Sequence, residues 1–271
     1  MASNHPDHVL TSMDFIKKAL KLIRKSQDPY LDANADGQLQ NLNVVTSYLD
    51  FNTGKPGDTG DMFVEPFPRA KMEQLMDRNR PWENPDCPSI LPIDNNLDNC
   101  GRARDLWNAF QGYLRLDKDD TAPSILDETG WKIVIPEEGD ILFPLLGNPM
   151  SWKVEDFVDK CDPKVPHMSC FMTSKLTHRD MVPCMSELET ILWITASRLL
   201  KKEYQNHRIV PVTIFSASGC SLRITQGYVN QRQLFVRMTP IIDFTEGEVK
   251  KWDEFIQTLC WMVGNPIGST I

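Results

Sequence analysis

The last third of the chain carries the pattern that most restricts its fold: a helix signal, three strand signals and a second helix signal. Ser186 and Glu189 form a capping-box pair before apolar residues at helical spacing, which predicts a helix to about residue 205. Three runs of β-branched and apolar residues follow at 209–216, 222–229 and 234–242. The loop between the last two runs is short enough for a hairpin, so we expect these strands to pair antiparallel.

A second capping-box pair, Thr245 with Glu248, precedes apolar residues that predict a final helix up to Gly264. This order of elements is typical of an α+β domain. We therefore expect an α+β fold with a small antiparallel sheet, helices packed on one face, and a proline-rich arm. We assign 1–150 to an acidic, helical and proline-rich N-terminal part and 151–271 to the helix–three strands–helix module, with both parts in one compact unit.

The patterns in the N-terminal part predict shorter helices and strands. Apolar spacing predicts helices over 11–25, 69–79 and 103–116. Seven prolines between Asn52 and Cys100 prevent long regular elements there, because each proline removes an N–H donor and restricts the residue before it. The arm nevertheless holds large apolar residues that favour an ordered segment over a core: Phe63, Phe67, Trp82 and Ile90. Further on, the patterns predict a hairpin over 131–146 and a helix over 152–160.

The net charge of -8 is distributed unevenly, with the acidic excess at 26–160 and a locally basic stretch at 186–240. An acidic total argues against nonspecific binding to nucleic acid or anionic membranes. We therefore expect a protein or small-molecule partner and no membrane association. The alternative is a nucleic-acid-binding set in the basic stretch: Arg198, Lys201, Lys202, Arg208, Arg223, Arg232 and Arg237.

The N-terminal residues lack the apolar run and cleavage site of a secretory signal, and Asp7 and Asp14 are unlike a mitochondrial presequence. The seven cysteines are odd in number and include no C-x-x-C pair, which indicates reduced thiols. We expect a cytoplasmic protein, with the nucleus as the alternative compartment.

Cysteine and histidine are concentrated between residues 161 and 184. Thiolate and imidazole are the ligands that zinc prefers, and four of these side chains would complete a tetrahedral site. The spacing matches no paired zinc-knuckle pattern, and buried thiols often pack as small apolar residues instead. Zinc is the one cofactor hypothesis that the sequence offers, with these ligands: Cys161, His167, Cys170, His178 and Cys184.

Asp32, Asn34, Asp36 and Gly37 match the opening of a calcium-binding loop. The twelfth position is Asn43, which cannot supply the bidentate carboxylate of such loops. Asx and Gly residues also dominate ordinary turns, so a solvated turn is the favoured interpretation.

Ser216, Ser218 and Cys220 follow a predicted strand, with His207 upstream, and form a candidate nucleophile set. The segment is not G-x-S-x-G, and a strand rather than a helix follows it, so a polar turn is favoured. The sequence also contains no glycine-rich nucleotide-binding motif.

The order helix, three strands, helix resembles the core of PD-(D/E)XK nucleases, which hold Mg²⁺ with acidic residues on the second and third strands. Here the run 222–229 has no acidic residue, and 234–242 lacks a D/E-x-K triplet, with only Arg237 in it and Asp243 after it. An active nuclease is therefore disfavoured. A degenerate relative that binds nucleic acid without cleaving it is the remaining form of this hypothesis.

The stretch from Ser186 to Phe244, with SELETILWITASRLL and QLFVRMTPIIDF, resembles a C-terminal region common in hypothetical proteins of filamentous fungi. The resemblance implies a fungal origin and a link to specialised-metabolite gene clusters, and it transfers no functional residue. We expect a non-enzymatic interaction or accessory protein of such a pathway. The alternative is a pathway enzyme, of cyclase or isomerase type, with an unrecognised site.

Overall fold

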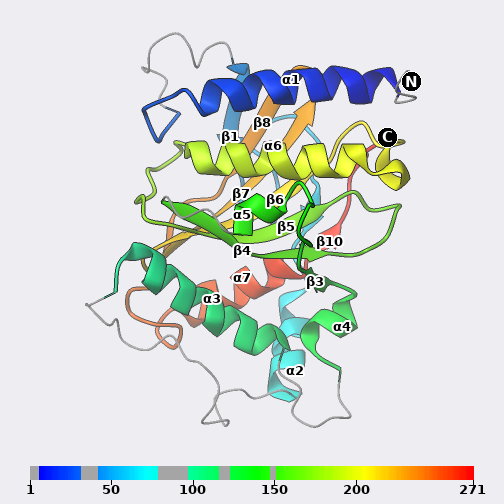
Figure 1. Ribbon diagram of the computed structural model, residues 1–271. Coiled ribbons are helices and arrows are strands. Elements are labelled where there is room, and N and C mark those ends of the chain that lie inside the picture. The colour runs from blue at the N-terminus through cyan, green and yellow to red at the C-terminus, as the bar shows by residue number, and fades with distance from the viewer. Residues whose placement is uncertain (1–5, 32–41, 79–96, 116–122, 147–150) are drawn as a thin grey trace.

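The computed structural model describes residues 6–31, 42–78, 97–115, 123–146 and 151–271 (Figure 1). The helices in these ranges are α1 Asp7–Ile23, α2 Arg69–Arg78, α3 Asn99–Arg115, α4 Ile125–Thr129, α5 Phe143–Leu146, α6 Met185–Leu200, the 3₁₀ helix η3 Lys202–Tyr204, and α7 Trp252–Met262. The strands are β1 Val44–Tyr48, β2 Val64–Glu65, β3 Lys132–Val134, β4 Trp152–Asp159, β5 Met168–Ser174, β6 Val212–Ser218, β7 Ser221–Asn230, β8 Gln233–Met238, β9 Ile242–Asp243 and β10 Asn265–Pro266.

The main sheet has eight strands and mixed pairing, in the order β1-β8-β7-β6-β5-β4-β3, with β9 beside β7. Strands β3, β4 and β5 form an antiparallel meander. Helix α6 then connects β5 to β6, which is parallel to β5. Strand β7 pairs antiparallel with both β6 and β8. Strand β1 lies at the edge of the sheet and is parallel to its neighbour β8.

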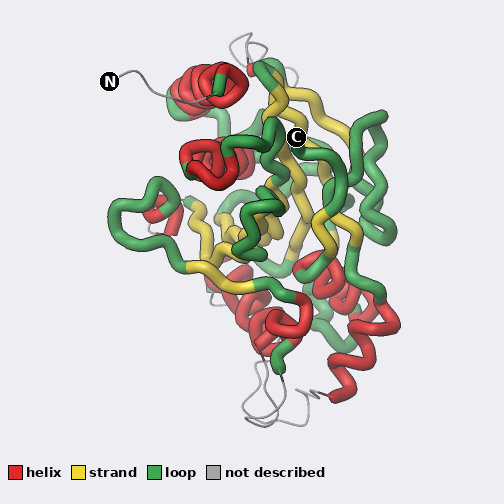
Figure 2. Tube along the Cα trace, turned by 90° about the vertical axis from the view of Figure 1, so that its right-hand side faces the viewer, coloured by secondary structure: helices red, strands yellow, loops and turns green. Residues whose placement is uncertain are grey.

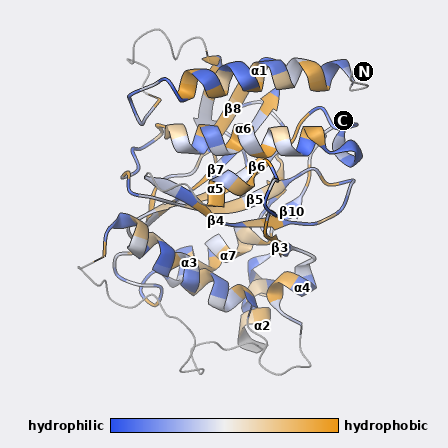
Figure 3. Ribbon diagram, in the orientation of Figure 1, coloured by the Kyte–Doolittle hydropathy of each residue, from blue (hydrophilic) through white to orange (hydrophobic). Residues whose placement is uncertain are grey.

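Helices cover both faces of this sheet, as Figure 2 shows from the side. Along β5, Cys170 packs in the cluster with α1 and α6, whereas Phe171 packs in the cluster with α3 and α7. Ile214 and Phe215 of β6 alternate in the same way, as side chains of a strand must. Every residue of β5 and β6 is buried, whereas α1 shows both hydrophilic and hydrophobic residues (Figure 3).

The expected α+β class is confirmed, but the expected small antiparallel sheet with one covered face is wrong. The sheet is large because β1 and β3, from before residue 150, pair with strands from after it. The division at residue 150 therefore runs through one sheet. Part of the proline-rich stretch is described: Phe63 is buried, and Val64 pairs with Pro266. Trp82 and Ile90 lie outside the described residues.

The strands β6, β7 and β8 and the helices α2, α3, α6 and α7 lie where the sequence predicts them, within a few residues. Two predictions between them are wrong. The expected hairpin over 131–146 is strand β3 followed by α5, and β3 pairs with β4 instead. The expected helix over 152–160 is β4, whose register shifts between Val154 and Asp156. This bulge places Val154 and Phe157 in one apolar cluster, three residues apart, which mimics helical spacing.

The N-terminus of α6 is capped two residues earlier in the sequence than the pair Ser186 and Glu189 suggests. Cys184 is the N-cap residue, and its backbone N–H donates to the Glu187 Oε2 at 2.8 Å. A carboxylate at this position also interacts favourably with the helix dipole. This local arrangement places Glu187 on the face of α6 that meets the sheet.

Candidate functional site

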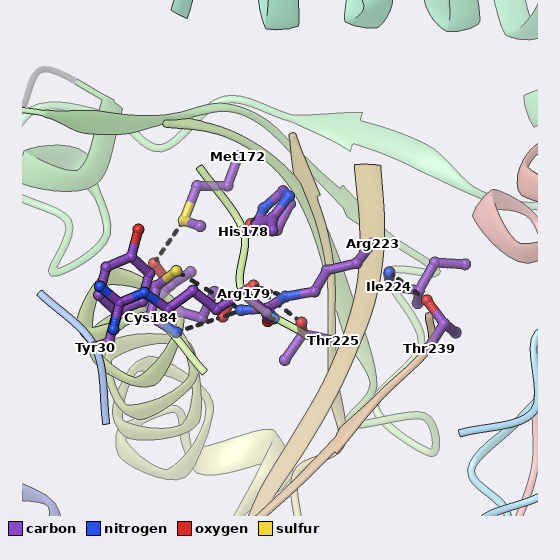
Figure 4. Close-up of polar contacts among 12 residues, drawn as sticks. Tyr30, Met172, His178, Arg179, Cys184, Arg223, Ile224, Thr225 and Thr239 are labelled. Atoms are coloured by element: carbon purple, nitrogen blue, oxygen red, sulfur yellow. Dashed lines mark hydrogen bonds and ion pairs between the residues drawn. The ribbon is translucent and has the colours of Figure 1, made fainter. Parts of the chain in front are cut away.

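A buried polar cluster with several hydrogen bonds lies under the N-terminus of α6 (Figure 4). Arg223 of β7 donates from Nε to Glu187 Oε1 at 2.9 Å, and its second terminal nitrogen bonds Oε2. The Thr225 hydroxyl donates to Oε1 at 3.0 Å. Burial opposes the ionisation of Glu187, but Arg223 outweighs it, so the pKa of Glu187 is lowered. The two charges therefore neutralise each other inside the protein.

The segment 175–184, between β5 and α6, covers this ion pair; we call it the covering segment. Arg223 Nη1 donates to the backbone oxygen of Arg179 at 2.9 Å. The Tyr30 hydroxyl donates to the backbone oxygen of Thr177 at 2.6 Å, and the Arg179 guanidinium lies 3.9 Å from the centre of the Tyr30 ring. Figure 4 shows Arg179 stacked beside Tyr30. The covering segment is thus fixed from two sides.

His178 of the covering segment lies against Ser216 of β6, with 3.1 Å between Nε2 and the hydroxyl oxygen. Burial lowers the pKa of His178 to about 4, so the ring is neutral near pH 7. The sequence pointed to His207 as the base near Ser216. His207 instead contacts Thr270 at 2.8 Å and the backbone oxygen of Pro163 at 3.1 Å. The serine–histidine pair that forms is therefore a different one.

A second polar cluster lies between α3 and the strands β4 and β5. The Glu155 carboxylate lies 2.6 Å from Lys153 Nζ and 3.4 Å from Arg104 Nε, and it accepts a hydrogen bond of 2.8 Å from the Thr173 hydroxyl. Its side chain is only 9% exposed. Lys175, directly after β5, lies 3.6 Å from Asp98. Glu155 thus has two cationic partners and one neutral donor.

Asp156, the next residue of β4, faces α3. It accepts hydrogen bonds from Trp107 Nε1 at 2.9 Å and from Gln111. Burial raises the pKa of Asp156. These bonds attach α3 to the bulge of β4, so Asp156 has a visible structural role.

Three members of the predicted nucleic-acid-binding set are internal and have acidic partners. Arg198 lies 2.6 Å from Asp159, Arg237 lies 2.7 Å from Asp58, and Arg223 pairs with Glu187 as described above. Guanidinium groups that are buried in ion pairs do not contact phosphates. The remaining members are exposed: Lys201, Lys202, Arg208 and Arg232.

The predicted zinc ligands lie at different places along β5. His167 precedes the strand and contacts the backbone oxygen of Ile267, whereas His178 contacts Ser216, which pairs with Met172, so about 15 Å of strand separates the two rings. A single tetrahedral site cannot include both. Cys170 packs in the apolar cluster with α1 and α6, Cys161 is exposed after β4, and Cys184 caps α6. Among the residues that the structure describes, no group of three or more His, Cys, Asp or Glu side chains is placed to hold a metal ion.

The calcium-loop candidate, Asp32 to Gly37, lies outside the described residues. The sequence-based analysis missed Glu187 and Glu155 as site residues. The usable signal was a charge inside an otherwise apolar pattern: Arg223 in the strand 222–229, and Glu187 in the first turn of a buried helix. Such residues are almost never fully buried without a partner.

The chain matches no protein-family model, no curated protein and no solved structure. No described helix has the length and apolar character needed to cross a membrane.

Proposed function

We propose that the protein is a non-enzymatic interaction or accessory protein, built on a nuclease-like core whose metal-binding position is occupied by internal ion pairs. The order of elements supports the nuclease-like core. Helix α3 precedes the three antiparallel strands β3, β4 and β5, and helix α6 follows them, with the short helices α4 and α5 inserted. This places the second and third strands at 152–174 instead of the 222–242 region where the sequence pattern first suggested them.

In this arrangement, the second strand supplies Glu155, and the third strand ends in Thr173 and Ser174, with Lys175 directly after it. This triplet has the lysine of a D/E-x-K motif, but threonine stands at the acidic position. The hydrogen bond between Thr173 and Glu155 shows that the two positions are adjacent across the sheet. The core therefore retains one carboxylate where a nuclease needs two.

The single observation that carries the proposal is the environment of Glu155. Magnesium is bound through carboxylates with several waters, in near-octahedral geometry. Glu155 instead lies 2.6 Å from Lys153 Nζ, so a cation already neutralises it. The hydroxyl of Thr173 takes up part of its remaining hydrogen-bonding capacity. We infer that this site stabilises the α3, β4 and β5 layer and performs no metal-dependent hydrolysis.

The fungal resemblance and the acidic total support an accessory role in a biosynthetic pathway, with a protein or small molecule as partner and the cytoplasm as compartment. Deletion of the gene, followed by metabolite profiling, tests this role. We expect lower product levels without a new accumulated intermediate, and full rescue by an allele that carries Glu155→Gln. Accumulation of one intermediate would instead identify an enzyme of cyclase or isomerase type and overturn the proposal.

Nucleic-acid binding is tested separately with labelled DNA and RNA at low ionic strength. We expect no retention, because three of the seven basic candidates are internal. Retention that falls steeply with salt would favour the degenerate nuclease-like binding module instead.

A further inference from the structure

We propose that the outer side of α1 is a docking surface for an acidic helix of a partner protein. The cations that make the contact are Lys17, Lys18, Lys21, Arg24 and Lys25, which we call the basic face. This inference rests on the interaction role proposed above and specifies the chemistry of the partner.

The position of α1 leaves one side of the helix open to solvent. The helix lies beside α6 at the margin of the molecule (Figure 1 and Figure 2). Its apolar side packs with α6 and the sheet, through residues such as Ile16, Leu20 and Ile23. Lys17 and Lys21 lie on the opposite side of the helix, and all five side chains of the basic face are exposed. The fold therefore uses only one side of α1.

The basic face carries charge of one sign. Five cations fall within residues 17–25, in a chain whose net charge is -8. Among the described residues, only Arg24 of the five has a carboxylate partner, Glu189 at 3.0 Å. Exposed cations elsewhere do pair with carboxylates, as Arg69 and Lys250 show. The four lysines of the basic face are thus available to anionic groups of another molecule.

The stability of α1 does not account for this arrangement. Lys17 is four residues and Lys18 three residues before Lys21, and like charges at these spacings destabilise a helix. The helix dipole favours cations only in the last turn, which contains Lys21 but neither Lys17 nor Lys18. Carboxylates of a partner that lie between these lysines would offset the repulsion.

The spacing of the lysines fits the carboxylates of a second helix. Lys17 and Lys21 are separated by about 6 Å along the helix axis, and acidic residues at every fourth position of a partner helix repeat at the same distance. Leu10, 43% exposed and about two turns before Lys17, lies on the same side of α1 and offers an apolar contact. Cations beside an exposed leucine suit a protein better than a phosphate polymer.

A bilayer surface and a second copy of the chain fit this face less well. An interfacial helix inserts its apolar side among the lipids, and that side of α1 is already buried. Two copies that met through α1 would bring two sets of five cations together, with only Asp7 and Asp14 of each helix to offset them. An acidic partner avoids both problems.

The test measures binding of a labelled probe peptide to the full chain by fluorescence anisotropy at low ionic strength. The probe is an alanine-based helix with glutamate at every fourth position, and the reference probe has glutamine at those positions. The double variant Lys17→Glu, Lys21→Glu reverses two exposed charges of the basic face. The matched control, Lys201→Glu, Lys202→Glu, makes the same change in net charge at exposed positions about 18 Å further along α6 than Glu189.

We expect wild type and the control to bind the glutamate probe and not the glutamine probe, with binding that weakens as salt is added. Lys17→Glu, Lys21→Glu should bind it about tenfold more weakly or worse. If wild type does not bind the glutamate probe, the proposal is wrong. An equal loss in both double variants would show that net charge and not the basic face governs binding, which also overturns it. Retention of duplex DNA or phosphatidylserine vesicles through Lys17 and Lys21, without binding of the probe, would assign the face to another class of partner and overturn it as well.

The deletion strain described above separates this inference from the accessory role. The allele Lys17→Glu, Lys21→Glu should fail to restore product levels, whereas the control allele should restore them. Full rescue by the first allele would overturn the docking surface and leave the accessory role in place. An intermediate that accumulates in the deletion strain itself would overturn the accessory role, whatever the probe binds.

Discussion

The Glu187 carboxylate and the Arg223 guanidinium meet inside the protein, and neither side chain is more than 1% exposed. The pair connects the first turn of α6 to the middle of β7, across the apolar layer between helix and sheet. Thr225, the N–H of Cys184 and the carbonyl of Arg179 complete its hydrogen bonds. A pair so fully satisfied fixes how α6 sits on the sheet.

Glu187→Gln should destabilise the fold by about 3–5 kcal/mol, because it leaves the Arg223 charge buried without a counter-charge. The free energy of unfolding from urea denaturation measures this loss. Lys250→Met is the control: its ion pair with Glu246 is exposed, so its loss should change stability by about 0.5 kcal/mol or less. The double variant Glu187→Met, Arg223→Met should recover much of the lost stability. A loss below about 1 kcal/mol in Glu187→Gln would contradict the role given to the pair.

Acid should destabilise the protein through two buried histidines. Burial lowers the pKa of His178 and of His167 to about 4 each, against about 6.5 in the unfolded chain. Between these pH values the histidines bind protons in the unfolded state but not in the folded state. Their contribution to the free energy of unfolding is therefore fully present above pH 6.5 and is lost as pH falls toward 4. The loss is about 3 kcal/mol for each histidine.

Urea denaturation at a series of pH values measures this dependence. The variant His178→Asn should show a distinctly smaller slope between pH 6.5 and 4 than wild type. An unchanged slope would mean that His178 titrates alike in the folded and unfolded chain, contrary to its burial.

Gly227 of β7 allows α6 to approach the sheet closely. A Cβ at this position would overlap the side chain of Ile191 on α6, with Cγ1 at 2.9 Å and Cγ2 at 3.0 Å. Gly227→Ala should therefore cost about 1–3 kcal/mol of stability. The smaller side chain of Ile191→Val should cost less in the Gly227→Ala background than in wild type. Additive effects in this double-mutant cycle would show that the two residues do not share the contact.

The sequence predicts the elements whose burial follows one regular period. Helix α6 has apolar residues at helical spacing, the strands β6 to β8 are runs of β-branched and apolar residues, and the positions of all four were predicted well. Strand β4 was mistaken for a helix because its bulge at Glu155 interrupts the alternation of inward residues. Strand β5 was missed because Ser, Cys, Met and Thr make a weak strand signal, although all seven of its residues are buried.

The size of the sheet and the composition of the candidate sites depend on contacts that no local pattern encodes. Val44 of β1 pairs with Leu234 of β8, far along the chain. Because the two strands are parallel, no hairpin turn joins them, and the local sequence gives no sign of the pairing. The partners of Ser216 and Glu155 are also set by the packing of separate elements. The sequence offered Ser216 as a nucleophile candidate with His207 upstream and favoured a polar turn; in the structure His178 lies beside Ser216, and His207 contacts Thr270.

Glu155 is neutralised by Lys153 and Arg104, accepts a hydrogen bond from Thr173, and by our proposal binds no catalytic metal. Isothermal titration calorimetry of Mn²⁺ into the wild-type protein and into Glu155→Gln tests the absence of a metal site at Glu155 most directly. We expect the two proteins to give the same heat, and neither to cleave DNA or RNA with Mn²⁺ present. Stoichiometric binding of Mn²⁺ to wild type that Glu155→Gln abolishes would contradict it.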